Sequence, residues 1–133
     1  MNTILRLALP LALLAAPAAA QPGASENATT PQALAQQMFA EANTAIGNAD
    51  YEAARRLLEA ALDLKPSHPA ILRGLAIVAL RAENPEDGFR ALERMARAGI
   101  VFDPEPLEDL LRTANTARFE AVAGQLATNS APV

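Results

Sequence analysis

The single histidine of this chain is the first residue to test for chemistry. His68 lies in the segment Pro66-Ser67-His68-Pro69, beside a hydroxyl. A general base or metal ligand needs oriented partners, and the chain has one His and no Cys, so no second imidazole or thiolate is available. Ser67 and His68 do not form a triad by adjacency alone, because a third group must orient the imidazole. We therefore predict that His68 is an exposed turn residue without a catalytic role.

Carboxylates between residues 103 and 109 form a second candidate site. Oxygen ligands suit calcium, but the spacing does not match an EF-hand loop and no glycine lies inside the cluster. Acidic residues also complement the dipole at a helix start, and we predict that role here. The isolated glycines do not form a phosphate-binding loop. The sequence thus predicts no metal and no cofactor, and the cluster consists of Asp103, Glu105, Glu108 and Asp109.

Composition narrows the class of protein further. The chain has 133 residues, which favours one domain, and 11 basic against 15 acidic residues give a net charge of -4. A negative chain is a poor match for nucleic acid, and it lacks the basic amphipathic stretches that hold proteins on membrane surfaces. Without Cys there are no disulfides. Ala and Leu dominate the apolar residues, which favours helices over strands.

The first twenty residues have the pattern of a secretory signal peptide. Arg6 supplies the positive charge, an apolar run from Leu7 to Ala20 follows, and small residues precede Gln21. That run is 14 residues long, shorter than the ~20 that a spanning helix needs, and two prolines interrupt it. We expect cleavage after Ala20 and export to the periplasm or the exterior of a bacterial cell. A retained membrane anchor is the alternative.

The rest of the chain is predicted to form one helical domain. We expect a flexible lead-in over 21–30, helices over 31–127 and a flexible tail over 128–133. Capping residues and prolines separate six apolar stripes with helical spacing. Ile100–Phe102 is the only short β-like run. The residues that begin, separate or end the predicted helices are Thr30-Pro31, Asn48-Ala49-Asp50, residues 66–69, Asn84-Pro85, Gly99, Asp103-Pro104 and Asn115-Thr116.

The chain repeats itself at a spacing of 34 residues. Shifting by 34 aligns Asp50 with Asn84 and Leu58 with Leu92, so the turn caps and the helix-contact positions coincide. Two antiparallel helices approach closely only where small residues face each other. We expect those crossings to be built by Ala42 with Ala54 and by Ala76 with Gly88.

These features resemble the tetratricopeptide repeat family. Asp50-Tyr51-Glu52-Ala53-Ala54 is similar to the family's turn and second-helix opening, and the segment from Ala61 to Pro66 is similar to its repeat ending. The second repeat, from Pro69 to about Gly99, departs from the pattern because Asn84-Pro85 replaces the usual aspartate–aromatic pair. The resemblance implies an all-α fold of two repeats with two C-terminal helices that cap the array. Self-pairing between chains is the other way to cover the exposed surface.

The resemblance also implies a binding surface, since the first helix of each pair lines the concave side in this family. Its mixed apolar and basic side chains suit an extended peptide or an acidic segment. Exposed charge is also common on helices that bind nothing. The expected groove residues are Phe39, Asn43, Ile46, Arg73, Ile77, Leu80 and Arg81.

Three classes of function remain at this point. The leading hypothesis is a non-enzymatic scaffold or assembly factor, periplasmic or secreted, that binds a protein or peptide on its concave helix face. The alternative is a homo-oligomeric structural protein whose repeat edge pairs with itself. An enzyme such as a hydrolase is less favoured, because no paired catalytic groups can be assembled from this sequence.

Overall fold

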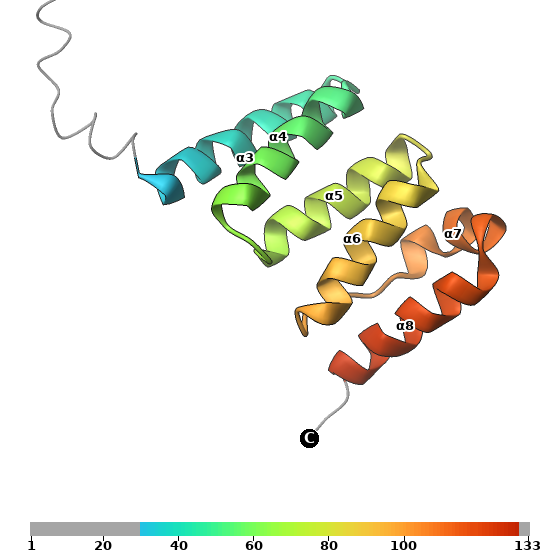
Figure 1. Cartoon of the computed structure of the whole chain (residues 1–133). Helices are drawn as coiled ribbons and strands as arrows, with labels where there is room; N and C mark the ends of the chain where they lie inside the picture. Colours follow the sequence, from blue (N-terminus) through green and yellow to red (C-terminus); the bar gives the residue numbers. More distant parts are fainter. Residues whose placement is uncertain (1–29, 131–133) are drawn as a thin grey trace, which may run out of the picture.

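A computed structural model describes residues 30–130, and over that range the chain is helical with no strand (Figure 1). The expected signal peptide lies outside the described residues. None of the described helices is long and apolar enough to cross a bilayer. In chain order the elements are α3 (Pro31–Gly47), α4 (Tyr51–Leu64), α5 (Pro69–Arg81), α6 (Pro85–Arg97), the 3-10 helix η2 (Glu105–Leu107), α7 (Glu108–Ala114) and α8 (Thr116–Ser130).

The helices form three antiparallel pairs that stack side by side: α3 with α4, α5 with α6, and α7 with α8. The first helices lie in one layer, since Phe39 of α3 approaches Gly74 of α5. The second helices lie in the other layer, where Arg94 of α6 meets Glu59 of α4. The expected all-α fold of two repeats followed by two capping helices is confirmed.

Side-chain caps begin the helices where the sequence predicted. Thr30 Oγ1 accepts a hydrogen bond from the Ala33 N–H at 3.0 Å, and Asp50 Oδ1 accepts one from Ala53 at 3.2 Å. Asn84 and Asn115 do the same at the starts of α6 and α8. Each such cap satisfies a backbone donor that the helix leaves unpaired and contributes about 1 kcal/mol.

The two repeats end their first helices in the same way. Ala49 and Glu83, 34 residues apart, both have a positive φ, 60° and 55°. The following N–H groups then close back on equivalent carbonyls, from Asp50 to Ala45 at 2.8 Å and from Asn84 to Ala79 at 2.9 Å. This is the hydrogen bond of a left-handed helix stop, so the sequence period is also a period of the backbone.

The small residues expected at the crossings are all buried, but one pairing differs from the expectation. Ala42, Ala54 and Ala76 are fully buried and Gly88 is buried with them. The atoms nearest to a Cβ built on Gly88 belong to Leu111, Leu107 and Ala79. Gly88 therefore makes room mainly for the η2–α7 segment. On α5 its closest neighbour is Ala79, where we expected Ala76.

Two boundaries near the C-terminus also differ from the sequence prediction. The helix expected from Asp103 begins as the 3-10 turn η2, because Glu105 precedes a proline and such residues avoid the α conformation. At the other end, residues 128–130, which we expected in a flexible tail, belong to α8. The Asn129 side chain holds that turn in place by donating to the carbonyls of Ala96 at 3.0 Å and Ile100 at 3.3 Å. The β-like run Ile100–Phe102 forms no strand.

Candidate interaction surface

The outward face of α5 carries a row of three exposed side chains. Arg73, Ile77 and Arg81 are four residues apart, which places them on one face of the helix. Ile77 is 43% exposed, one of two large apolar side chains in the described chain with that much contact with water. Neither guanidinium forms a side-chain hydrogen bond or ion pair with any residue in the range 30–130. The row therefore offers two uncompensated positive charges around an apolar side chain.

The neighbouring helix α3 supplies the other expected residues at equivalent positions. The 34-residue repeat places Phe39, Asn43 and Ile46 where Arg73, Ile77 and Leu80 lie on α5. Asn43 is exposed, whereas Phe39, Ile46 and Leu80 are half-buried. Phe39 Cε1 lies 3.7 Å from the Cβ position of Gly74, so the two helices are neighbours. The sequence-predicted residues thus lie on two adjacent helices of one layer.

One end of this surface is hollowed. A cavity of about 210 Å³ lies between the first turns of α3 and α5 and the loop before α5, and Phe39 and His68 both line it. None of the other six predicted groove residues lines this cavity. The expected groove residues therefore border this cavity through Phe39.

His68 differs from the exposed turn residue that the sequence predicted. It occupies the position before α5 and is half-buried. Its Nδ1 atom is shielded from water and has no hydrogen-bond partner among the described residues. In the described part of the chain, no group of three or more His, Cys, Asp and Glu residues is placed to hold a metal ion.

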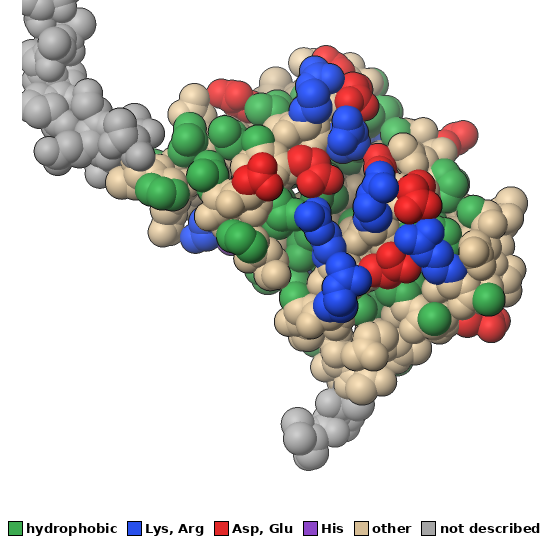
Figure 2. Space-filling model, in the orientation of Figure 1, with side chains coloured by type: hydrophobic (Ala, Val, Ile, Leu, Met, Phe, Trp, Pro, Cys, Tyr) green, Lys and Arg blue, Asp and Glu red, His purple; other side chains and the backbone are tan. Residues whose placement is uncertain are grey.

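An ion-pair cluster on the second-helix layer was not predicted from the sequence. Arg118 of α8 binds Glu93 of α6 through two bonds of 2.8 and 2.9 Å and reaches Glu86 at 3.0 Å. Its guanidinium also stacks 4.4 Å from the ring centre of Phe89. Figure 2 shows side chains of both charges interspersed on the face that carries α4 and α6. The partners are 25 and 32 residues apart in the sequence, so no local spacing could have revealed them.

A second arginine stabilises the last helix pair in the same manner. Arg112 of α7 binds Glu108 at 2.6 Å and Glu120 of α8 at 3.0 Å, and it lies 4.9 Å from the Phe119 ring centre. Glu108 therefore belongs to this contact. Glu105 lies in the first turn of η2, and Glu108 and Asp109 lie in the first turn of α7, where carboxylates complement a helix dipole.

The Arg118 contact makes stability depend on pH. The hydrogen bond from Arg118 holds the pKa of Glu93 below its ordinary value of 4.5, despite partial burial. A carboxyl with a lowered pKa stabilises the fold above its unfolded-state pKa and loses that contribution as pH falls through the folded-state value. We expect Glu93→Gln to lower the free energy of unfolding by roughly 0.5–1 kcal/mol at neutral pH. The difference from wild type should vanish well below pH 4.5, as measured by urea denaturation.

The matched control is Glu52→Gln. Hydrogen bonding to Arg55 also lowers the pKa of Glu52, but both side chains lie at the surface of the same helix, α4. Its substitution should therefore have the smaller effect. An effect of Glu93→Gln that stayed constant across the pH range would contradict this assignment.

Comparison with known proteins agrees with the helix pairing. The sequence model of the tetratricopeptide repeat matches residues 33–99, which covers α3 to α6 together with their turns. The chain belongs to the tetratricopeptide repeat family. Searches of curated proteins and of solved structures give no significant match.

Membership of this family indicates a surface that binds other proteins. Tetratricopeptide repeats generally mediate contacts between proteins, and the family is generally a non-enzymatic scaffold. The matched region ends at Gly99, so η2, α7 and α8 lie beyond the recognised repeats. They nevertheless pack on the second repeat as a third helix pair and cover its buried face.

Proposed function

We propose that this protein is a non-enzymatic interaction module, exported to the periplasm or secreted, that binds a protein or peptide on the outward face of α3 and α5. Family membership supports the binding role, and the N-terminal sequence pattern supports export. The observation that carries the choice of surface is the row Arg73, Ile77, Arg81. It combines an exposed apolar side chain with two arginines that the described fold leaves without ion-pair partners.

The chemistry of that row favours an acidic segment with an apolar residue. A guanidinium recognises carboxylates with two parallel hydrogen bonds, so binding would supply the partners that the fold does not. Positions 73 and 81 are eight residues apart on a helix, a distance of about 12 Å at 1.5 Å per residue. An extended peptide covers that distance in about four residues, because it rises ~3.3 Å per residue. Two acids flanking an apolar side chain at that separation match the row.

The test is charge reversal on this face. We expect Arg73→Glu with Arg81→Glu to abolish capture of those partners that wild-type protein retains from a cell-envelope extract. The control is Arg56→Glu with Arg90→Glu, which makes the same change in net charge on α4 and α6. These two arginines are exposed and form surface ion pairs that contribute little to stability. Equal capture by both double variants would reject the α3–α5 face.

Self-association is the second candidate, because one edge of the array is uncovered. Met38 and Leu57 in the first repeat are half-buried, whereas Leu72 and Ala91, at the equivalent positions of the second repeat, are buried. The difference arises because the first repeat covers the second but has no repeat before it within the described chain. A second copy could cover this edge. Sedimentation as a monomer at micromolar concentration would exclude that function, and a concentration-dependent dimer would support it.

A further inference from the structure

The β-like run Ile100–Phe102 plays no part in the surfaces described above. It belongs to residues 100–104, which connect α6 to η2 without a helical turn (Figure 1). A simple connection is usually rich in small and polar residues, whereas Ile, Val and Phe are typical of strands. Side-chain exposure alternates along the segment, with half-buried Ile100, Phe102 and Pro104 and exposed Val101 and Asp103. This period of two is that of an extended chain with one face on the fold.

The backbone of this segment is bonded to the rest of the fold through one residue. The Ile100 N–H donates to the Met95 carbonyl at 3.0 Å, and the Ile100 carbonyl accepts from the Asn129 side chain at 3.3 Å. In an extended chain the N–H and C=O of alternate residues point to the same edge, so those of Val101 and Asp103 point to the edge opposite to the Ile100 contacts. None of these groups forms a hydrogen bond within the described chain. The segment therefore presents an unpaired edge to which an extended peptide can add as a strand.

A hollow of about 260 Å³ adjoins the segment, between it and the C-terminal half of α8. Part of its apolar lining is open to solvent, since Ala127 of α8 is exposed and Val101 is 59% exposed. No other large apolar side chain in the described part of the chain has as much contact with water as Val101. Pockets for small molecules usually have about 300–1,000 Å³. This smaller, open hollow fits one side chain of a peptide better than a whole small molecule.

Two carboxylates give the region around the unpaired edge a negative charge. Asp103 and Glu105 are both exposed, and neither forms an ion pair with another described residue. Asp103 Oδ1 accepts a hydrogen bond from the Glu105 N–H at 3.0 Å, which leaves its Oδ2 atom available. The helix dipole explains Glu105, in the first turn of η2, but Asp103 lies before that helix. A cationic side chain of a partner would supply the ion pair that the described fold does not.

We propose that residues 101–103 bind an extended segment of a partner protein as an added antiparallel strand. Val101 and Asp103 each exchange two backbone hydrogen bonds with the partner residue opposite, as alternate residues do in an antiparallel pair. The side chains of those two partner residues then lie on the same face as Val101 and Asp103. An apolar side chain fits opposite Val101, where it also enters the hollow, and lysine or arginine fits opposite Asp103. Because the strands run in opposite directions, the partner sequence reads basic, any residue, apolar.

Charge favours this occupant over a second copy of the chain. A second copy that added the same segment would bring its own Asp103 and Glu105 to the edge, where like charges repel. A basic and apolar segment meets attraction at the same place. The occupant also differs from the acidic segment proposed for the α3–α5 face, so this site does not depend on that proposal.

A short peptide tests this site directly. The probe is a blocked peptide with lysine, threonine and valine in that order at its centre and serine elsewhere, titrated into the isotope-labelled protein and followed by NMR. We expect the amide protons of Val101 and Asp103 to shift and to exchange more slowly with solvent, because each gains a hydrogen-bond acceptor. The Phe102 amide points to the other edge and should gain no protection. Methylation of the backbone nitrogen of the peptide's valine removes a donor of the pair and should abolish binding, and glutamate in place of lysine should weaken it.

Matched protein variants separate binding from folding. Asp103→Asn keeps an oxygen for the Glu105 N–H but removes the charge, so it should weaken binding about two- to fivefold, the scale of a cross-strand charge pair. Asp63→Asn makes the same change in charge on α4 and should leave the affinity unchanged. Val101→Ala should also weaken binding, because it removes apolar contact. Since Val101 is 59% exposed, the stability of the fold should stay nearly constant in that variant.

Several results would overturn the proposal. Absence of protection at Val101 and Asp103, or equal binding of the methylated peptide, would exclude pairing through the backbone. Equal affinities of Asp103→Asn and Asp63→Asn would exclude the charge pair. Protection that appears without peptide and grows with protein concentration would show that a second copy is the occupant, and binding only after removal of residues 131–133 would show that those residues are. The charge-reversal test on α5 leaves this segment unaltered, so either site can fail without the other.

Discussion

Phe89→Ala should cost the domain about 3–5 kcal/mol of unfolding free energy, the range for removing a buried aromatic ring. Phe89 is 2% exposed and lies on α6, between the second repeat and the last helix pair. Arg118 of α8 stacks on the same ring, so the substitution removes core packing and a contact that holds α8. Domains are stable by only about 5–15 kcal/mol, and we therefore expect a partly unfolded population at room temperature. Urea denaturation followed by circular dichroism measures the change.

Ile77→Ala is the control for this prediction. It also shortens a large apolar side chain in a helix, but Ile77 is 43% exposed and should cost well under half as much. Near-equal losses of unfolding free energy for the two variants would show that Phe89 is not a core residue. A second readout is the hydrogen exchange of α8, which should increase in Phe89→Ala and stay unchanged in Ile77→Ala.

Gly88→Val should destabilise the protein by about 1–3 kcal/mol through overpacking. A Cβ at residue 88 would lie 3.1 Å from Leu111 Cδ2 and 3.3 Å from Leu107 Cδ2. Both leucines are buried, at 0% and 1% exposure, so their ends have no free space to enter. The branched side chain would push the η2–α7 segment away from α6. Thermal or urea denaturation measures the loss.

Gly124→Val separates crowding from helix propensity. Gly124 is also inside a helix, α8, but a Cβ there meets nothing within 4 Å. Valine is a better helix former than glycine, so this variant should be neutral or slightly stabilising. The difference between the two variants measures the close approach at Gly88. A Gly88→Val protein as stable as Gly124→Val would contradict the packing of η2 and α7 on α6.

Local sequence signals predicted the helices well, and one of the two exceptions has a local cause too. Thr30, Asp50 and Asn84 act on backbone groups three residues away, so their effect does not depend on the rest of the fold. The 3-10 start at Glu105 follows from Pro106, because a residue before proline avoids the α conformation. The helical turn at residues 128–130 had no such signal. It is held by Asn129, whose partners lie 29 and 33 residues earlier in the chain.

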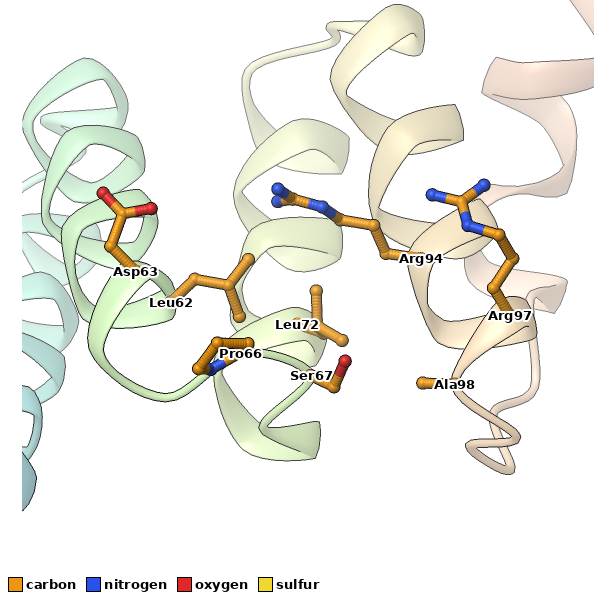
Figure 3. Close-up of a pocket in the computed structure, with 8 residues that line it drawn as sticks. All are labelled: Leu62, Asp63, Pro66, Ser67, Leu72, Arg94, Arg97 and Ala98. Atoms are coloured by element: carbon orange, nitrogen blue, oxygen red, sulfur yellow. The ribbon is translucent and has the colours of Figure 1, made fainter.

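The predicted interaction residues follow from the resemblance to the family and not from local signals such as helix caps. The structure places Phe39, Asn43 and Ile46 on α3 beside α5, but whether they bind a partner stays a prediction. A hollow of about 420 Å³ that Arg94 and Arg97 border was not predicted (Figure 3). Its residues come from three separate helices and a turn, and their side chains meet only after the second repeat has packed on the first.

The sequence by itself determined where most of the helices begin and end, that the first two helix pairs recur at a spacing of 34 residues, and that small side chains are needed between them. These features depend on backbone hydrogen bonds and on side-chain size, which act within a few residues of the chain. Only the tertiary structure decided that Leu111 packs against Gly88, that Arg118 links α8 to α6, and that two arginines of α6 border a hollow. The physical reason is that these contacts depend on how the helix pairs rotate and stack against each other, and many weak interactions distributed over the whole core set that geometry.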